Sequence, residues 1–247
     1  MATPTQTKLD RSRVVSQAEW LAARKELLTK EKEFNRQRDA LSAERRKLPF
    51  VKVEKEYVFE GPNGPKKLSE LFGYHWQLII YHFMFDPEWE EGCKSCSHFM
   101  DNIAGSVVHL AARDTSFAVI SRAPLPKIES FKKRMGWTFS WPSSFDTDFN
   151  YDFHVTLDAA AGSIEYNYAN AADLVKARKL WSEKGELPGL SIFVREGDNV
   201  FHAYSTYQRG LDLSLNTYNL LDLTPLGRQE EGERIQAWIR HHDRYQA

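Results

Sequence analysis

Cysteine is scarce in this chain, because only two of its 247 residues are cysteines and they lie three positions apart. A secreted protein held together by disulfides uses more cysteines at wider spacings, which excludes that class. Long hydrophobic runs are missing too, and no stretch reaches the roughly 18–20 apolar residues of a membrane helix. Residues 1–13 are polar and lack the apolar centre of a secretory signal. We therefore expect a cytoplasmic protein that does not enter a membrane.

An excess of charge of either sign is also absent. The 33 basic and 34 acidic residues leave a formal net charge of -1, so nothing in the charge balance favours nucleic acid or an anionic membrane as a partner. No phosphate-binding loop and no G-x-G-x-x-G motif occurs, and we expect no cofactor. Apolar residues make up 42% of the chain, which is enough to fill the core of a globular protein.

A long helix is predicted near the N-terminus, ending before Pro49. Ser16 and Glu19 have the spacing of a capping box, and no glycine or proline follows until Pro49. The larger apolar side chains recur at every seventh position, at Trp20, Leu27, Phe34, Leu41 and Leu48. A stripe this narrow is typical of a helix that packs along its own protein or against a second subunit. We interpret residues 1–49 as a tail and helical arm, which forms either an intramolecular clasp or the contact of a homodimer.

The remaining residues, 50–247, alternate between strand and helix patterns. Short runs of strand-forming residues predict strands at 78–84, 117–120, 153–157, 190–194 and 200–204, the last two joined as a hairpin by the turn at 196–199. Amphipathic or charged segments predict helices at 96–110, 127–135, 170–181 and 229–243. This order predicts an α/β domain with a mixed sheet covered by helices on both faces.

The two cysteines form a Cys93-Lys94-Ser95-Cys96 turn that follows the first buried strand and opens a helix. A helix N-terminus carries about half a positive charge, which stabilises a thiolate and lowers the pKa of Cys93. The spacing places Cys96 on the same helical face, where it can attack a mixed disulfide on Cys93. This pattern favours thiol–disulfide exchange with a disulfide-containing protein or a small thiol substrate.

Two other interpretations of the cysteines remain open. They supply half of a tetrahedral zinc site, which His98, His75, His82 or a second subunit would have to complete, and no paired histidine motif is present. They can also be two ordinary buried thiols. We predict no metal.

The order of these segments resembles that of the thioredoxin-like superfamily. The resemblance lies in residues 57–110, which contain the strand, the dithiol turn and the helix, and in LPGLSIF at 187–193. It implies a thioredoxin-like fold in which Pro188 is a cis-proline that faces the dithiol and leaves a backbone edge for a substrate chain.

A closer resemblance is to a bacterial family of unknown function described as predicted dithiol–disulfide oxidoreductases. It is carried by EGCKSCS at 91–97, VISRAPL at 119–125, RMGW at 134–137 and DFNYDF at 148–153. It implies an enzyme in which Cys93 and Cys96 are catalytic. The chain departs from thioredoxins, because Gly92 stands where they place a tryptophan and Trp89 lies further back. Glu90 stands where peroxiredoxins have the threonine of T-x-x-C.

The distance from Cys96 to Pro188 exceeds that of a minimal thioredoxin, which predicts an insertion around 136–185. Its aromatic part, 137–153, either lines a pocket beside the dithiol or packs over the sheet. We place Trp89, Arg122 and Pro188 in the substrate-binding region, Arg122 because ligands gather where strands end. His154 and His202 are interpreted as structural. A thiol peroxidase and a binding protein without redox turnover are the alternative functions.

Overall fold

The computed structural model describes residues 10–230 and 235–245, and the chain divides into two compact units, Met1–Leu48 and Pro49–Ala247. The first unit contains the 3-10 helix η1 (Arg11–Arg13) and the long helix α1 (Gln17–Arg45). At the start of α1, the Ser16 hydroxyl accepts from the Glu19 amide at 3.3 Å, and the Glu19 carboxylate accepts from the Ser16 amide at 2.9 Å. The predicted capping box and the uninterrupted helix are confirmed.

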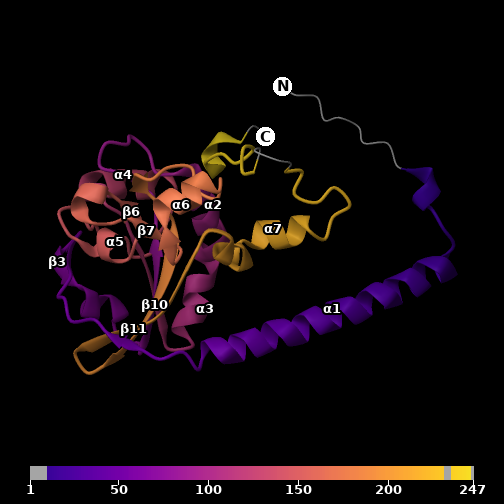
Figure 1. Ribbon diagram of the computed structural model, residues 1–247, viewed down its shortest axis with the longest axis horizontal. Helices are drawn as coiled ribbons and strands as arrows, with labels where there is room; N and C mark the ends of the chain where they lie inside the picture. Colours follow the sequence, from indigo (N-terminus) through magenta and orange to yellow (C-terminus); the bar gives the residue numbers. More distant parts are fainter. Residues whose placement is uncertain (1–9, 231–234, 246–247) are drawn as a thin grey trace. The chain divides into compact units, whose positions relative to one another are not determined.

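The second unit is built on a five-stranded sheet with the order β1-β11-β10-β4-β5 (Figure 1). Its strands are β1 (Val51–Lys52), β4 (Gln77–His82), β5 (Thr115–Ile120), β10 (Gly189–Glu196) and β11 (Asn199–Tyr207). β4 and β5 are parallel, whereas β10 is antiparallel to both β4 and β11. The connection from β4 to β5 contains α2 (Lys94–Ile103), η3 (Ala104–Ser106) and α3 (Val107–Ala111), and α4 (Leu125–Arg134) follows β5. A parallel pair with a helical crossover, followed by an antiparallel hairpin, confirms the predicted thioredoxin-like mixed sheet.

Shorter elements surround this sheet. They are β2 (Val58–Gly61), β3 (Gly64–Lys67), η2 (Leu68–Phe72), α5 (Phe149–Asp152), β6 (Thr156–Leu157), η4 (Ala159–Ala161), β7 (Glu165–Tyr166), β8 (Ala169–Asn170), α6 (Ala171–Lys176), β9 (Gly185–Glu186), η5 (Gln208–Ser214), α7 (Asn216–Leu221) and η7 (His242–Arg244).

Three predicted boundaries are wrong. The strand at 153–157 shrinks to β6, because α5 precedes it and His154 has a left-handed φ of 55°. The helix at 170–181 ends with Lys176, and Arg178 is also left-handed. Of the helix at 229–243, residues 231–234 lie outside the described residues, 235–238 form turns, and only η7 is helical.

Apolar residues on the two faces of the sheet belong to separate cores. Tyr81 and Phe83 of the β4 segment pack with residues of α2, α4, η5 and α7, whereas Leu78 and Ile80 pack with η2, β2 and α5. This alternation follows from the period of two in a strand. The aromatic segment 137–153 contributes Trp137, Phe139 and Trp141 to the first core and Phe149 and Phe153 to the second. It therefore packs against the sheet.

A row of polar side chains crosses the second face inside this apolar core. His82 Nε2 bonds Ser191 Oγ at 2.8 Å, Ser191 Oγ bonds Ser205 Oγ at 2.7 Å, and His202 Nε2 bonds Ser205 Oγ at 2.8 Å. The row links β4, β10 and β11, which gives His202 the structural role predicted for it. Within the described part of the chain, no helix is long and apolar enough to cross a membrane.

Candidate active site

Cys93 stands at the N-terminal cap of α2, directly after the loop that leaves β4. Its amide donates to the Met84 carbonyl at 3.0 Å, and its own carbonyl accepts from the Ser97 amide and hydroxyl, each at 2.9 Å. These bonds fix the backbone of the turn against the end of β4. The Cys93 side chain is half-buried, and the Cys96 side chain, one helical turn later, is 1% exposed. The predicted position of the dithiol at a helix start is confirmed.

The environment of Cys93 favours its thiolate. A hydrogen bond from the Cys96 thiol is the largest cause that lowers the pKa of Cys93 from 9.0 to about 7. Burial opposes this shift, whereas the amides of Cys96 and Ser95 and the Ser95 hydroxyl strengthen it. A thiol with a pKa near 7 is about half ionised at neutral pH, so Cys93 can act as a nucleophile.

Cys96 is held in its protonated form. Burial is the largest cause that raises the pKa of Cys96 well above its usual value, and the neighbouring Cys93 adds to the shift. Its sulfur also accepts a hydrogen bond from the Met84 amide at 3.4 Å and another from the Tyr81 hydroxyl. One half-buried acidic thiol that faces the cavity and one shielded protonated thiol are the pair that a two-step exchange needs.

The loop before the dithiol is clamped by residues near the C-terminus. His241 Nε2 donates to the Gly92 carbonyl at 2.9 Å, and Glu91 forms ion pairs with Arg134 at 2.8 Å and with Arg244. Gly92 is buried, and a Cβ added there would lie 2.6 Å from Phe83 Cε1. A tryptophan before the first cysteine therefore cannot fit, which explains the departure from thioredoxins.

We expect Gly92→Ala to destabilise the protein by about 1–3 kcal/mol, because the added methyl group overpacks a finished core. The second ring that it meets, Phe131, has Cε1 at 2.8 Å, and both rings are nearly fully buried. The free energy of unfolding in urea measures the effect. Gly105→Ala is the control, because a Cβ at Gly105 meets nothing within 4 Å. Equal stability of the two variants would contradict this account of Gly92.

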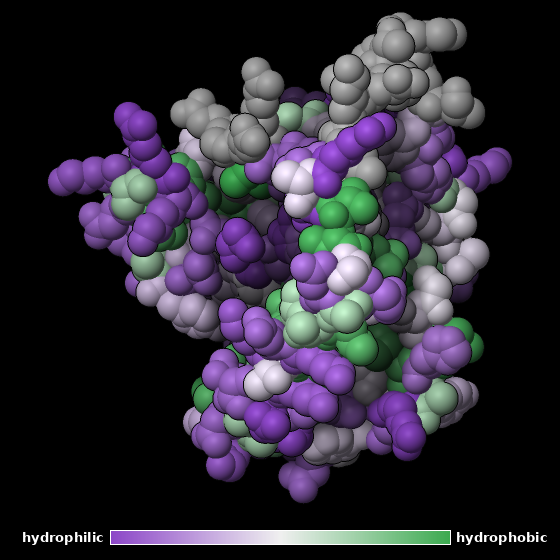
Figure 2. All heavy atoms as spheres, turned by 90° about the vertical axis from the view of Figure 1, so that its right-hand side faces the viewer, coloured by the Kyte–Doolittle hydropathy of each residue, from purple (hydrophilic) through white to green (hydrophobic). Residues whose placement is uncertain are grey.

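Both sulfurs face a cavity of about 1030 Å³. Apolar and aromatic side chains surround the dithiol end of it: Tyr81, Met84, Phe99, Tyr166, Pro188, Leu211, Leu215 and Tyr218. No residue of the aromatic segment 137–153 is among the described residues that line the cavity, whereas the later part of the predicted insertion contributes Tyr166, Lys179 and Trp181. On the face seen in Figure 2, the surface is hollowed, and hydrophobic side chains (green) lie among hydrophilic ones (purple).

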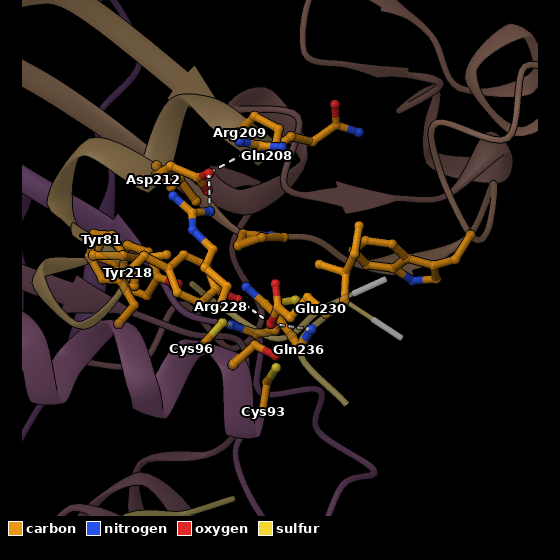
Figure 3. A pocket seen from close by; sticks show the side chains of 18 of the residues that line it. Tyr81, Cys93, Cys96, Gln208, Arg209, Asp212, Tyr218, Arg228, Glu230 and Gln236 are labelled. Carbon is orange, nitrogen blue, oxygen red and sulfur yellow. Dashed lines mark hydrogen bonds and ion pairs between the residues drawn. The ribbon is translucent and has the colours of Figure 1, made fainter. Parts of the chain in front are cut away.

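Charged residues also line the cavity, and in Figure 3 Arg209 and Asp212 lie away from Cys93 whereas Glu230 lies near the dithiol. Arg228 pairs with Asp222 at 2.7 Å and with Asp212 at 3.1 Å, and its guanidinium lies 4.1 Å from the Tyr218 ring centroid. Arg209 also pairs with Asp212, at 2.8 Å. The cavity thus combines the dithiol, apolar and aromatic walls, and fixed charges of both signs.

Pro188 lines the cavity, but the substrate edge expected beside it does not exist. The Pro188 peptide bond is trans, as are all peptide bonds in the described residues. The preceding backbone is already paired, since the Leu187 amide donates to the Val155 carbonyl at 2.8 Å and β9 pairs with β6. The Tyr166 hydroxyl donates a hydrogen bond to the Pro188 carbonyl at 2.8 Å. The cis-proline and the open edge implied by the thioredoxin resemblance are therefore wrong for this chain.

The structure does not bring Trp89 and Arg122 to the cavity, and neither is among the described residues that line it. Trp89 is 37% exposed on the preceding loop. Arg122 pairs with the buried carboxylate of Glu186 at 2.9 Å, and Thr156 donates to the same carboxylate. An arginine that neutralises a buried carboxylate is held by that partner, because separating them would leave a buried charge.

The histidines considered as zinc ligands have other surroundings. His98 is 7% exposed and packs edge-on against Tyr218 and Trp238. His75 lies 3.5 Å from Asp114, and His82 belongs to the buried row of polar side chains described above. Within the described residues, no group of three or more histidine, cysteine, aspartate or glutamate side chains is placed to hold a metal ion.

Several lining residues were not predicted from the sequence. Tyr81 could have been found, because strand alternation points it to the sheet face that α2 covers. Tyr166, Tyr218 and Arg228 come from β7, α7 and the turn after α7, which are distant in sequence, and no motif marks them.

One protein family and several solved structures are similar to this chain. A protein family described as "Bacterial protein of unknown function (DUF899)" matches residues 9–245. Among solved structures, a peroxidoxin BcpB from Mycobacterium tuberculosis is 12% identical with a TM-score of 0.41, and the match covers 70% of this chain and 96% of that one. A mitochondrial 2-Cys peroxiredoxin from Plasmodium falciparum is 12% identical with a TM-score of 0.42, covering 70% and 94%. A search of curated proteins finds no match.

Proposed function

The chain belongs to this bacterial family of unknown function, and we propose that it is a thiol–disulfide oxidoreductase with Cys93 as nucleophile and Cys96 as resolving thiol. The observation that supports this most is the asymmetry of the pair. Cys93 is half-buried at a helix N-terminus and opens to the cavity, while Cys96 lies shielded and protonated within hydrogen-bond distance of it.

The reaction proceeds by two successive thiol–disulfide exchanges. The Cys93 thiolate attacks one sulfur of the substrate disulfide, forming a mixed disulfide and releasing the other sulfur as a thiolate. Cys96 then gives up its proton to this released thiolate, and its sulfur attacks Cys93 Sγ. A Cys93–Cys96 disulfide forms and the second substrate thiol leaves. The substrate gains the two electrons that the dithiol loses, and two equivalents of an external thiol then reduce the Cys93–Cys96 disulfide back to the dithiol.

Hydrogen bonds to Cys96 support the second exchange, in which Cys96 attacks the mixed disulfide. The Met84 amide and the Tyr81 hydroxyl both point at Cys96 Sγ, so they can stabilise the negative charge that develops there when its proton leaves. Tyr81 is held rigidly for this, because its ring stacks on Phe99 with centroids 4.2 Å apart.

The proposal is tested by mixing the reduced protein with a small disulfide under anaerobic conditions. We expect two substrate thiols to be released for each protein, together with a Cys93–Cys96 disulfide found by peptide mapping. The rate should rise with pH around a midpoint near 7, the pKa of Cys93, because only the thiolate reacts. The protein with both cysteines replaced by serine is the control.

Other results would replace the proposal. Rapid oxidation of the pair by hydrogen peroxide, with slow reaction toward disulfides, would indicate the thiol peroxidase. A pair that reacts with neither oxidant faster than a free thiol of ordinary pKa would indicate a binding protein.

A further inference from the structure

We propose that the cavity takes a low-molecular-weight disulfide built from amino acids, a zwitterion such as cystine, in preference to a disulfide within a protein chain. This inference rests on the proposed function, because it names the substrate class of the same site. Three features carry it: the paired backbone beside Pro188, the size of the cavity and the charges that line it.

The backbone beside the dithiol offers no edge to an incoming protein chain. A chain that docks by strand addition needs free amide and carbonyl groups. Here the Leu187 amide is bonded to Val155, and the Pro188 carbonyl is bonded to Tyr166. Segment β6 of the same chain thus occupies the place where a substrate strand would pair.

The size of the cavity suits a small molecule. Ligand sites for small molecules are concave and measure about 300–1,000 Å³, with apolar walls and a few polar groups. The cavity reaches about 1030 Å³, and aromatic side chains surround its dithiol end, including Tyr166 and Tyr218. A protein disulfide would have to bring its flanking backbone into this concave space, which requires local unfolding of the substrate protein. A small disulfide fits without such a change.

The charges select the chemistry of that molecule. The cations are Lys179, Arg209 and Arg228, and the carboxylates are Asp212, Asp222 and Glu230. Lys179 is exposed and takes no part in the ion pairs of Arg209 and Arg228. Fixed charges of both signs complement a ligand that carries carboxylate and ammonium groups together. Arg209 and Arg228 already pair with Asp212 and Asp222, whereas no described ion pair holds Lys179 or Glu230. A neutral disulfide would leave these two charges without an ionic partner, so a zwitterion is preferred.

The test compares three disulfides: cystine, the neutral bis(2-hydroxyethyl) disulfide and insulin. Each kcat/KM is divided by the rate of uncatalysed reduction by dithiothreitol, which removes differences in intrinsic reactivity. We expect cystine to exceed both others by about tenfold or more. Lys179→Gln should raise KM for cystine by about threefold and leave the neutral disulfide unaffected. Lys184→Gln is the matched control, because Lys184 is exposed and outside the lining residues.

The outcomes separate this inference from the proposed function. If either insulin or the neutral disulfide is reduced as efficiently as cystine, the inference is overturned, while the proposed oxidoreductase function still holds. If no disulfide is reduced, the proposed function fails. Calorimetric titration of cystine into the protein with serine at both cysteine positions then decides the ligand class. Saturable binding that Lys179→Gln weakens supports a zwitterionic ligand, and absence of binding overturns it.

Discussion

Serine at position 93 is expected to lower disulfide turnover by on the order of 10⁴-fold or more, whereas serine at position 96 should stop the protein after one half-reaction. A serine hydroxyl is not ionised at neutral pH, so Cys93→Ser removes the nucleophile. In Cys96→Ser, the nucleophile remains but nothing displaces the bound half of the substrate. A mixed disulfide on Cys93 should accumulate, one for each protein, and mass spectrometry of the intact protein measures it.

The two variants control each other, because each keeps one thiol in the same fold. Cys96→Ala removes the hydrogen bond that contributes most to the low pKa of Cys93, so the alkylation midpoint of Cys93 should rise above 7 in that variant. Stable mixed disulfides on Cys96 in the Cys93→Ser protein would reverse the assigned roles. Equal turnover by both variants would show that the dithiol is not the reacting group.

Features set by local sequence could be predicted well. The capping box at Ser16, the strand β4 and the helix start at Cys93 all depend on residues within a few positions of one another. The hairpin of β10 and β11 is equally local. For these elements, side-chain periodicity and turn chemistry point to the same structure that tertiary packing selects.

The form of the site depends on contacts that no local pattern records. Pairing between β6 and β9 joins segments about thirty residues apart, and it closes the edge that the Pro188 resemblance implies. Arg122 follows a strand, as predicted, but its partner Glu186 lies far along the chain and holds it away from the dithiol. Apart from Lys179, the charged residues of the cavity come from a segment after β11 whose charges indicate only a solvated surface.

The buried row of His82, Ser191, Ser205 and His202 should make the stability of the protein depend on pH between 7 and 5. Burial is the largest cause that lowers the pKa of His82 from 6.5 to about 3, and the nearby His202 adds to the shift. His82 therefore stays neutral in the folded protein while the unfolded chain takes up a proton below pH 6.5. Its contribution to stability is complete above that pH and is lost as the pH falls toward 3.

For His82 alone, the linkage relation gives a loss of about 2 kcal/mol in the free energy of unfolding between pH 7 and pH 5. Burial likewise lowers the pKa of His202, which adds to the slope with the same sign. This range lies above the ordinary pKa values of aspartate and glutamate, so carboxylates other than Glu186, whose pKa is raised by burial, contribute little to the difference. Urea unfolding at the two pH values measures it.

The variant His82→Gln separates this effect from other titrating groups. Glutamine keeps an amide that can reach Ser191 but does not titrate, so the variant should be less stable at pH 7 and lose about 2 kcal/mol less on going to pH 5. His109→Gln, which replaces an exposed histidine, should keep the wild-type difference. If His82→Gln shows the same pH dependence as the wild type, His82 is protonated in the folded protein and the row carries a buried charge. The core would then tolerate an imidazolium among Phe149, Phe153 and Ser191, which the absence of any described partner for His82 Nδ1 argues against.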